Sequence, residues 1–288
     1  MAGATQQIDL PMVEADVIYG RRDGDAPQLH SNMPIEAQIA MDRHRIRIRD
    51  ARPIADSLSL DREGFILRDH AAVTPFEPDF IPFNFDRKRD LPPINRRYAE
   101  EMLPLIAELS GGDVVVPQAG RMTLRATPRT GLPTSDSTAP LVHLDYTPNA
   151  IRDAIALTFG LEGRDVPTHR RVALYQTWRV LVPPPHDSLL AICDARSVSD
   201  GATMVMQTYT ASREAEAEQI EVRLCSYEPG HRWYYFSDMR PDELLIFKGY
   251  DSDHPQSASG AHVAFDNPLA DEPNGRISIE ARYIIFWN

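Results

Sequence analysis

The sequence predicts a mainly β fold, a sandwich or barrel with helices on its flank. From about residue 171 to the C-terminus the chain consists of short runs of alternating apolar and polar residues separated by turn-forming residues, the pattern of consecutive β-strands. Only two earlier stretches, 95–110 and 149–160, are expected to form substantial helices. With 288 residues, 42% of them hydrophobic and 25% charged, the chain can bury the core of one large β domain.

The N-terminal 40 residues are expected to form an arm or lid segment, because Pro11, Pro27 and Pro34 interrupt a polar stretch. Residues 41–288 contain no repeat and no linker that would divide them, and they are expected to form a single domain. Two strands and then a proline-rich loop with four phenylalanines are expected before the first helix, at 44–50, 64–69 and 74–93.

The clearest helix is expected at 95–110, where apolar residues recur at helical spacing and Gly111 can end the helix. Pro104 predicts a kink or break within it. The second helix, 149–160, has Asn149 as its expected N-cap. A short polar helix or helical loop is expected at 212–222. Further strands are expected at 113–117, 121–127, 171–182, 223–227, 231–239, 243–252, 261–265 and 276–287, and one more begins at 188.

Composition narrows the class of partner and the compartment. The net charge of −12 argues against a nucleic-acid partner, which requires an excess of Lys and Arg on at least one face. The basic stretch 43–49 alternates Arg with Ile, as in a half-solvated strand, although it could also bind a polyanion. No segment approaches the roughly 20 apolar residues that span a bilayer, and the N-terminus lacks a secretion signal. The only cysteines, Cys193 and Cys225, are expected to be free thiols, which indicates a reducing, cytoplasmic setting.

The stretch "VHLDYTP", residues 142–148, contains the most informative pair of side chains. His143 and Asp145 lie two residues apart, and in a strand such residues point to the same face. A distant histidine would complete the two-histidine, one-carboxylate face that non-haem Fe(II) oxygenases use, which leaves coordination positions open. The best candidate is His262 in "GAHVAFDNP", and His254 in "DSDHPQS" is the alternative.

The last predicted strand carries a row of polar side chains. In "RISIEARY" one face holds Arg276, Ser278, Glu280 and Arg282. Such a row is either exposed to solvent or directed into a site. An arginine fork beside a serine hydroxyl is suited to binding a carboxylate.

The sequence resembles the Fe(II)/2-oxoglutarate-dependent hydroxylase/desaturase family that includes cephamycin methoxylation proteins and related fungal natural-product oxygenases. The resemblance extends over nearly the whole chain beyond about residue 45. Besides the "VHLDYT" motif, the segments that carry it are 49–53, 60–67, 97–115, 177–198, 231–253, 261–268 and 276–282.

The resemblance implies a double-stranded β-helix, the jelly-roll or cupin-like fold. It implies that His143, Asp145 and His262 hold Fe(II), and that Arg276 with Ser278 binds the distal carboxylate of 2-oxoglutarate, with Arg282 as the alternative anchor. The expected reaction uses O2 and couples decarboxylation of 2-oxoglutarate to hydroxylation, desaturation or oxidative cyclisation at a C–H bond. The expected substrate is a small molecule, a natural product or an amino-acid derivative.

Several other residues are candidates for the substrate pocket: Tyr146, Tyr175, Trp178, Arg179 and Arg121. Structural packing would equally explain the two tyrosines and the pair Trp178 and Arg179. Arg121, Arg125 and Arg179 could bind a substrate carboxylate, although nothing in the sequence places them in the pocket. Two other functions remain open. A zinc-type divalent-metal hydrolase could use the same three ligands to activate water. A non-catalytic β-barrel binding protein could retain the fold alone. The sequence does not predict the oligomeric state.

Overall fold

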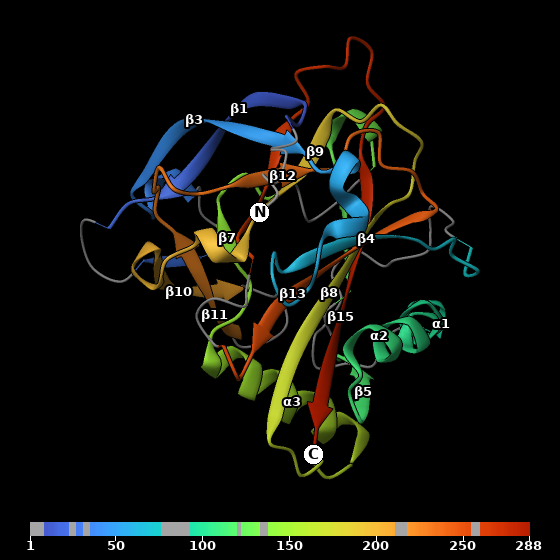
Figure 1. Cartoon of the computed structure of the whole chain (residues 1–288). Helices are drawn as coiled ribbons and strands as arrows, with labels where there is room; N and C mark the ends of the chain where they lie inside the picture. Colours follow the sequence, from blue (N-terminus) through green and yellow to red (C-terminus); the bar gives the residue numbers. More distant parts are fainter. Residues whose placement is uncertain are drawn as a thin grey trace, which may run out of the picture.

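The computed structural model describes residues 9–22, 27–30, 35–75, 93–119, 122–132, 138–210, 218–254 and 260–288. Within these residues, strands predominate and form two sheets, with helices at one end of the molecule (Figure 1). The predicted mainly β class is therefore confirmed. None of the described helices is long and apolar enough to cross a membrane.

The larger sheet contains nine strands within the described residues. Their order is β1 (Met12–Gly20), β3 (Met41–Asp50), β12 (Trp233–Tyr235), β9 (Ser188–Cys193), β14 (His262–Asp266), β7 (His143–Leu144), β11 (Glu218–Cys225), β10 (Thr203–Thr210) and β2 (Gln28–His30).

The smaller sheet contains six strands on the same basis. Its main path is β4 (Phe65–Asp69), β13 (Glu243–Asp251), β8 (Arg171–Val180), β15 (Ile277–Trp287) and β5 (Val114–Pro117), and β6 (Thr123–Ala126) also pairs with β15. The long central strands β8 and β15 are antiparallel, with Arg282 opposite Gln176. This register decides which side chains share a face.

Helices cover the flank of the smaller sheet. They are α1 (Pro93–Glu101), α2 (Leu103–Ser110) and α3 (Pro148–Glu162). Short 3-10 helices lie in the connections: η1 (Ile35–Ala37), η2 (Arg52–Ser57), η3 (Pro128–Thr130), η4 (Ala195–Ser197) and η5 (Asp200–Ala202). The helical stretch predicted at 95–110 is broken at Met102, as Pro104 predicts, and it ends at Gly111 in the left-handed conformation.

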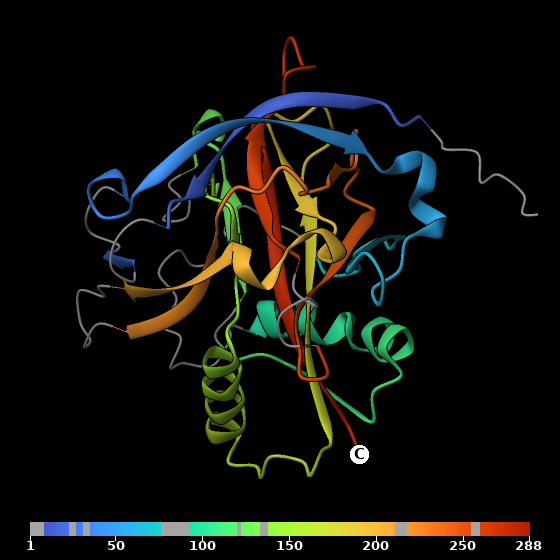
Figure 2. The same cartoon turned by 60° about the vertical axis from the view of Figure 1, so that its left-hand side comes forward.

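The larger sheet buries apolar side chains on both of its faces. On β9, Ile192 belongs to the main core, which also includes residues of the smaller sheet, whereas Leu189, Ala191 and Cys193 belong to a second core on the opposite face. That second core is covered by β1 and β3, which arch over the other strands (Figure 2). The other face, which carries Ile192 and the neighbouring His262, lies opposite this second core.

Three sequence-based expectations about local structure require correction. The first 40 residues are not irregular throughout, because β1 is a regular nine-residue strand that pairs with β3 over its whole length. Residues 218–222 are not helical but belong to β11, because pairing with β10 overrides their local preference. The N-cap of α3 is Thr147 and not Asn149. Most of the proline-rich loop, residues 76–92, lies outside the described residues.

Candidate metal centre and co-substrate site

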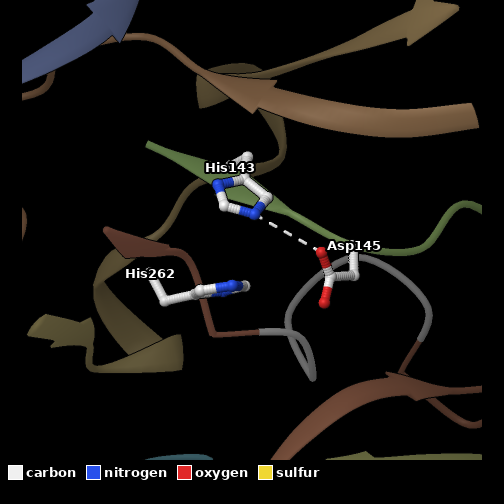
Figure 3. Close-up of side chains that lie close together, drawn as sticks. All are labelled: His143, Asp145 and His262. Atoms are coloured by element: carbon white, nitrogen blue, oxygen red, sulfur yellow. Dashed lines mark ion pairs between the residues drawn. The ribbon is translucent and has the colours of Figure 1, made fainter. Parts of the chain in front are cut away.

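Two neighbouring strands bring both histidines together. In the larger sheet β7 lies beside β14, and the register places His262 directly opposite His143, with 4.3 Å between their ring centroids. Asp145 follows β7 at the position expected for the same face. Figure 3 shows the three side chains directed toward one another. The structure therefore places together the three residues that the sequence proposed as ligands.

The donor atoms of these residues are close enough to share one cation. His143 Nε2 lies 3.4 Å from Asp145 Oδ1, and one donor atom from each of the three residues lies within 4.8 Å of the other two. Two cis ligands at about 2.1 Å from a metal lie about 3 Å apart. All three side chains are at least half-buried, so water competes weakly for these atoms.

Hydrogen bonding leaves the required nitrogen of His143 available. Its Nδ1 lies 2.8 Å from the carbonyl oxygen of Leu141, so Nδ1–H donates and Nε2 keeps its lone pair on the side of Asp145. His262 is buried, and its Nδ1 has no hydrogen-bond partner among the described residues. A buried ring nitrogen without a partner is costly in a purely structural histidine.

The charge states of these residues suit a divalent metal. Burial, with a smaller contribution from His143, lowers the pKa of His262 to about 4, so this imidazole is neutral at pH 7. Burial raises the pKa of Asp145, but the positive charge of Arg282 outweighs it and holds that pKa well below its ordinary value. A carboxylate with neutral imidazoles is the donor set of non-haem iron sites.

The polar row on β15 faces the interior. Arg276 is 1% exposed, Ser278 0% and Arg282 4%, so the interpretation of this row as a solvated face is wrong. Pairing with β8 directs these side chains toward the same space as Trp178.

Arg276 has the properties of an unsatisfied anion site. Its Nη1 lies 3.4 Å from Ser188 Oγ, but its Nε has no hydrogen-bond partner, and no carboxylate of the described residues forms an ion pair with it. Burial, with a smaller contribution from Arg125, lowers the pKa of Arg276 to about 10, so the guanidinium remains charged at pH 7. Ser278 Oγ is also buried without a partner. A buried cation beside an unpaired hydroxyl fits a carboxylate ligand.

Arg282, the alternative anchor, is already occupied by protein groups. Its Nη2 donates to Asp145 Oδ2 at 3.1 Å and to Glu280 Oε2 at 3.0 Å, and its Nε donates to Gln176 Oε1 at 3.0 Å. Arg125, one of the arginines that the sequence offered for a substrate carboxylate, instead pairs with Glu280 at 2.9 Å. Gln176 was not identified as a site residue from the sequence, and only the strand register could have indicated it.

The three candidate pocket residues on β8 lie on two different faces of the strand. Trp178 lies on the interior face, and its ring centroid is 5.6 Å from Arg276 Cζ. Tyr175 and Arg179 lie on the opposite face of β8, where Arg179 Nη1 donates to the carbonyl oxygens of His70 and Pro241.

Two candidate residues do not belong to the triad, and one lies outside the described residues. The Tyr146 hydroxyl donates to Gln118 Oε1 within the core beneath α3. His254 lies near Lys248 and is exposed, and it is not part of the triad. Arg121 lies outside the described residues.

Comparison with known proteins agrees with this geometry. A family model described as "Oxidoreductase/YMDC permease-like domain" matches residues 18–286. The chain is 30% identical over 247 residues, 84% of its length and 83% of the relative, to the Fe(II)/2-oxoglutarate-dependent dioxygenase nvfI of Aspergillus novofumigatus. It is 27% identical over 307 residues, 98% of both proteins, to the hydroxylase/desaturase efuI of Hormonema carpetanum.

A solved structure supports the same relationship. The iron and α-ketoglutarate-dependent endoperoxidase NvfI superposes with a TM-score of 0.76 at 26% identity, covering 96% of this chain and 98% of that one. Fold and site together define a jelly-roll protein with a two-histidine, one-carboxylate centre. The chain belongs to the family of Fe(II)/2-oxoglutarate-dependent dioxygenases and hydroxylase/desaturases.

Family membership confirms several predictions at once. The chain is an oxidoreductase of the Fe(II)/2-oxoglutarate-dependent class, with Fe(II) as its metal and 2-oxoglutarate and O2 as co-substrates. Its jelly-roll core and its action on a small molecule agree with the sequence-based expectation.

Proposed function

We propose that His143, Asp145 and His262 bind Fe(II), and that Arg276 with Ser278 binds the distal carboxylate of 2-oxoglutarate. The observation that carries the proposal is the β7–β14 register, which sets His262 opposite His143 with Asp145 on the same side. A zinc-type hydrolase could use the same ligands. It would have no use for the buried cation and hydroxyl of Arg276 and Ser278, which favours the oxygenase.

The residues of the site have separate tasks. When bound, Fe(II) with 2-oxoglutarate supplies oxidative decarboxylation, which is coupled to oxidation of a substrate C–H bond. His143 and His262 contribute nitrogen donors, of which the buried His262 is neutral at pH 7, and Asp145 contributes a negative charge. Arg276 lacks a carboxylate partner among the described residues and can therefore orient an incoming dicarboxylate, whereas Arg282 already binds Asp145 and Glu280. For this reason Arg276 is the proposed anchor.

The proposed substrate is a natural product or an amino-acid-derived molecule, and the outcome is hydroxylation, desaturation or oxidative cyclisation. Support comes from the relatives, which include hydroxylase/desaturases and a gibberellin cluster GA4 desaturase of Gibberella fujikuroi, 24% identical over 306 residues. Trp178, on the interior face beside Arg276, is proposed to line the pocket. A cytoplasmic location is proposed on the basis of two buried, free thiols, Cys193 and Cys225.

An anaerobic titration with Fe(II) and 2-oxoglutarate tests the ligand set. The wild-type protein is expected to develop a metal-to-ligand charge-transfer band, and His262→Ala is expected to lose both the band and succinate formation with its fold intact. His254→Ala, which changes the other candidate histidine, is the matched control and should behave as the wild type does. Full activity in His262→Ala would refute the ligand assignment, and activity independent of oxygen and 2-oxoglutarate would indicate a hydrolase.

The same titration separates the two candidate anchors. Arg276→Gln removes the charge that faces the co-substrate, so the Kd for 2-oxoglutarate should rise at least tenfold, since a charge-assisted bond contributes about 1.5–3 kcal/mol. Fe(II) affinity in the absence of 2-oxoglutarate should not change. An unchanged Kd for 2-oxoglutarate in this variant would eliminate Arg276 as the anchor.

A further inference from the structure

A buried chain of alternating charges leads to the proposed metal ligand Asp145. It runs from Arg125 on β6 to Glu280 and Arg282 on β15 and ends at Asp145, and we call it the charge chain. Arg125 Nε donates to Glu280 Oε1 at 2.9 Å, and Arg282 Nη2 donates to Glu280 Oε2 at 3.0 Å and to Asp145 Oδ2 at 3.1 Å. These side chains are between 3% and 22% exposed. Their formal charges cancel, so none is buried without compensation.

The two oxygens of Asp145 have different partners. Oδ2 accepts the hydrogen bond from Arg282, whereas Oδ1 is the oxygen 3.4 Å from His143 Nε2. Oδ1 is therefore the oxygen that lies beside His143, whereas Oδ2 is held by Arg282.

Arg282 itself is held from two further directions. Gln176, opposite it on β8, accepts from Nε at 3.0 Å, and Glu280, two residues earlier on the same face, accepts from Nη2. Rotation of the guanidinium would break at least one of these bonds. The planar fork of arginine can serve all three acceptors at once, which the compact ammonium group of lysine cannot do.

We infer that Arg282 is a positioning residue that holds Asp145 so that it binds the metal through Oδ1 alone, with Glu280 and Gln176 fixing Arg282. The inference rests on the proposed metal ligands. A carboxylate that binds through a single oxygen leaves the remaining positions of the metal open for co-substrate and oxygen. A carboxylate that binds through both oxygens would occupy one of these open coordination positions. By holding Oδ2 of Asp145, the charge chain therefore keeps that position available for co-substrate or oxygen.

The experiment uses Co(II) as a spectroscopic probe, because its visible bands report coordination number. Co(II) is titrated into metal-free wild-type protein, Arg282→Gln and Arg282→Lys, and 2-oxoglutarate is then added to each. Arg171→Gln is the matched control, because Arg171 also lies on the smaller sheet and pairs with a buried carboxylate, that of Asp251, five residues along β8 from Gln176. Circular dichroism confirms the fold of each variant.

We expect Arg282→Gln to bind Co(II) about 10- to 100-fold more weakly, as is usual when a partner of a metal ligand is lost, and to show altered Co(II) bands. Arg282→Lys should recover part of the affinity, because it retains the charge, but not the wild-type bands. Arg171→Gln should change neither property. If Arg282→Gln does not fold, altered bands in Arg282→Lys carry the same conclusion.

Two results would overturn the inference. One is wild-type Co(II) affinity and bands in the Arg282 variants, which would make Arg282 merely structural. The other is loss of 2-oxoglutarate binding with unchanged Co(II) binding, which would make Arg282 the co-substrate anchor. Failure of the proposed function is a different observation, because the Co(II) bands of otherwise wild-type protein would then be unaffected by His262→Ala.

Discussion

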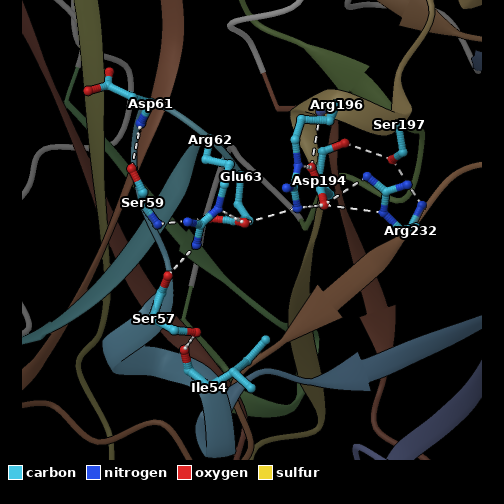
Figure 4. A network of polar contacts seen from close by, with 10 residues as sticks. All are labelled: Ile54, Ser57, Ser59, Asp61, Arg62, Glu63, Asp194, Arg196, Ser197 and Arg232. Atoms are coloured by element: carbon cyan, nitrogen blue, oxygen red, sulfur yellow. Dashed lines mark hydrogen bonds and ion pairs between the residues drawn. The ribbon is translucent and has the colours of Figure 1, made fainter. Parts of the chain in front are cut away.

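Asp194 is a buried carboxylate outside the site that joins distant parts of the chain. It is 0% exposed and accepts hydrogen bonds from Arg196 and Arg232, and Arg196 also forms an ion pair with Glu63 at 2.9 Å. Figure 4 shows how this network links the turn after β9 with the loop before β4 and the segment before β12. β9 lies directly beside β14, which carries His262. The network therefore fixes the end of a strand that neighbours the candidate metal centre.

The charge of Asp194 should make part of the stability dependent on pH. Burial raises the pKa of Asp194, but hydrogen bonds from Arg196 and Arg232 outweigh it, and the folded-state pKa lies below its ordinary value. The stabilisation is therefore fully present above the unfolded pKa of about 3.9 and is lost as the pH falls through the lower folded pKa.

We expect Asp194→Asn to lower the free energy of unfolding by about 2 kcal/mol at pH 7, and this difference should shrink between pH 4 and pH 2. Urea denaturation at a series of pH values measures it. Asp266→Asn, which removes an equal charge at an exposed position, is the control. A difference between wild type and Asp194→Asn that stays constant down to pH 2 would show that the charge is not responsible.

At the scale of elements, the start of α3 is fixed by a side chain that follows the proposed metal ligand Asp145 by two residues. Thr147 Oγ1 accepts from the backbone N–H of Ala150 at 3.0 Å and donates to Glu221 Oε2 on β11 at 2.6 Å. One hydroxyl thus caps the helix and joins it to the strand beside β7. The sequence suggested Asn149 for this task because asparagine also caps helices, but Pro148 occupies the first helical position and Thr147 precedes it.

Thr147→Ala should reduce the free energy of unfolding by about 1–2 kcal/mol, the usual cost of removing an N-cap. Thr147→Ser keeps the hydroxyl and should remain close to the wild type. Thermal unfolding of the metal-free proteins measures both. Equal melting temperatures for Thr147→Ala and Thr147→Ser would mean that the cap contributes nothing.

At the scale of the whole molecule, β1 contributes buried residues to the second core of the larger sheet. Val13, Val17 and Tyr19 are buried against the face of the larger sheet that lies away from the metal centre. This packing predicts that the N-terminal strand is integral to stability, whatever role the residues before and after it have.

Val17→Asp places a carboxylate without a partner in that core and should destabilise the protein by about 4 kcal/mol or more. Met12→Asp puts the same side chain at a position on β1 that is 47% exposed, and its effect should stay within about 0.5 kcal/mol. Chemical denaturation compares the two. Equal stability for both variants would identify β1 as a dispensable arm.

Much of this arrangement could be predicted because it depends on period-two alternation. His143 and Asp145 share a face for that reason, and so do Arg276, Ser278 and Arg282. The alternation also runs through β1, but the prolines near it suggested an irregular segment. In contrast, residues 218–222 resemble a helix locally and form a strand because β10 provides a pairing partner.

The sequence by itself determined the mainly β class, the break at Pro104, the shared face of the charged row on β15 and the identity of the chain's relatives, because these depend on residue type and local spacing. Tertiary structure decided that His262 and not His254 lies opposite His143, that Arg276 lacks an anionic partner among the described residues while Arg282 is bound to Asp145, and that Arg179 points away from the site. The physical reason is strand register: which residues face each other across two strands depends on how distant segments pair, and that pairing is set by burial of the whole core rather than by any single stretch of sequence.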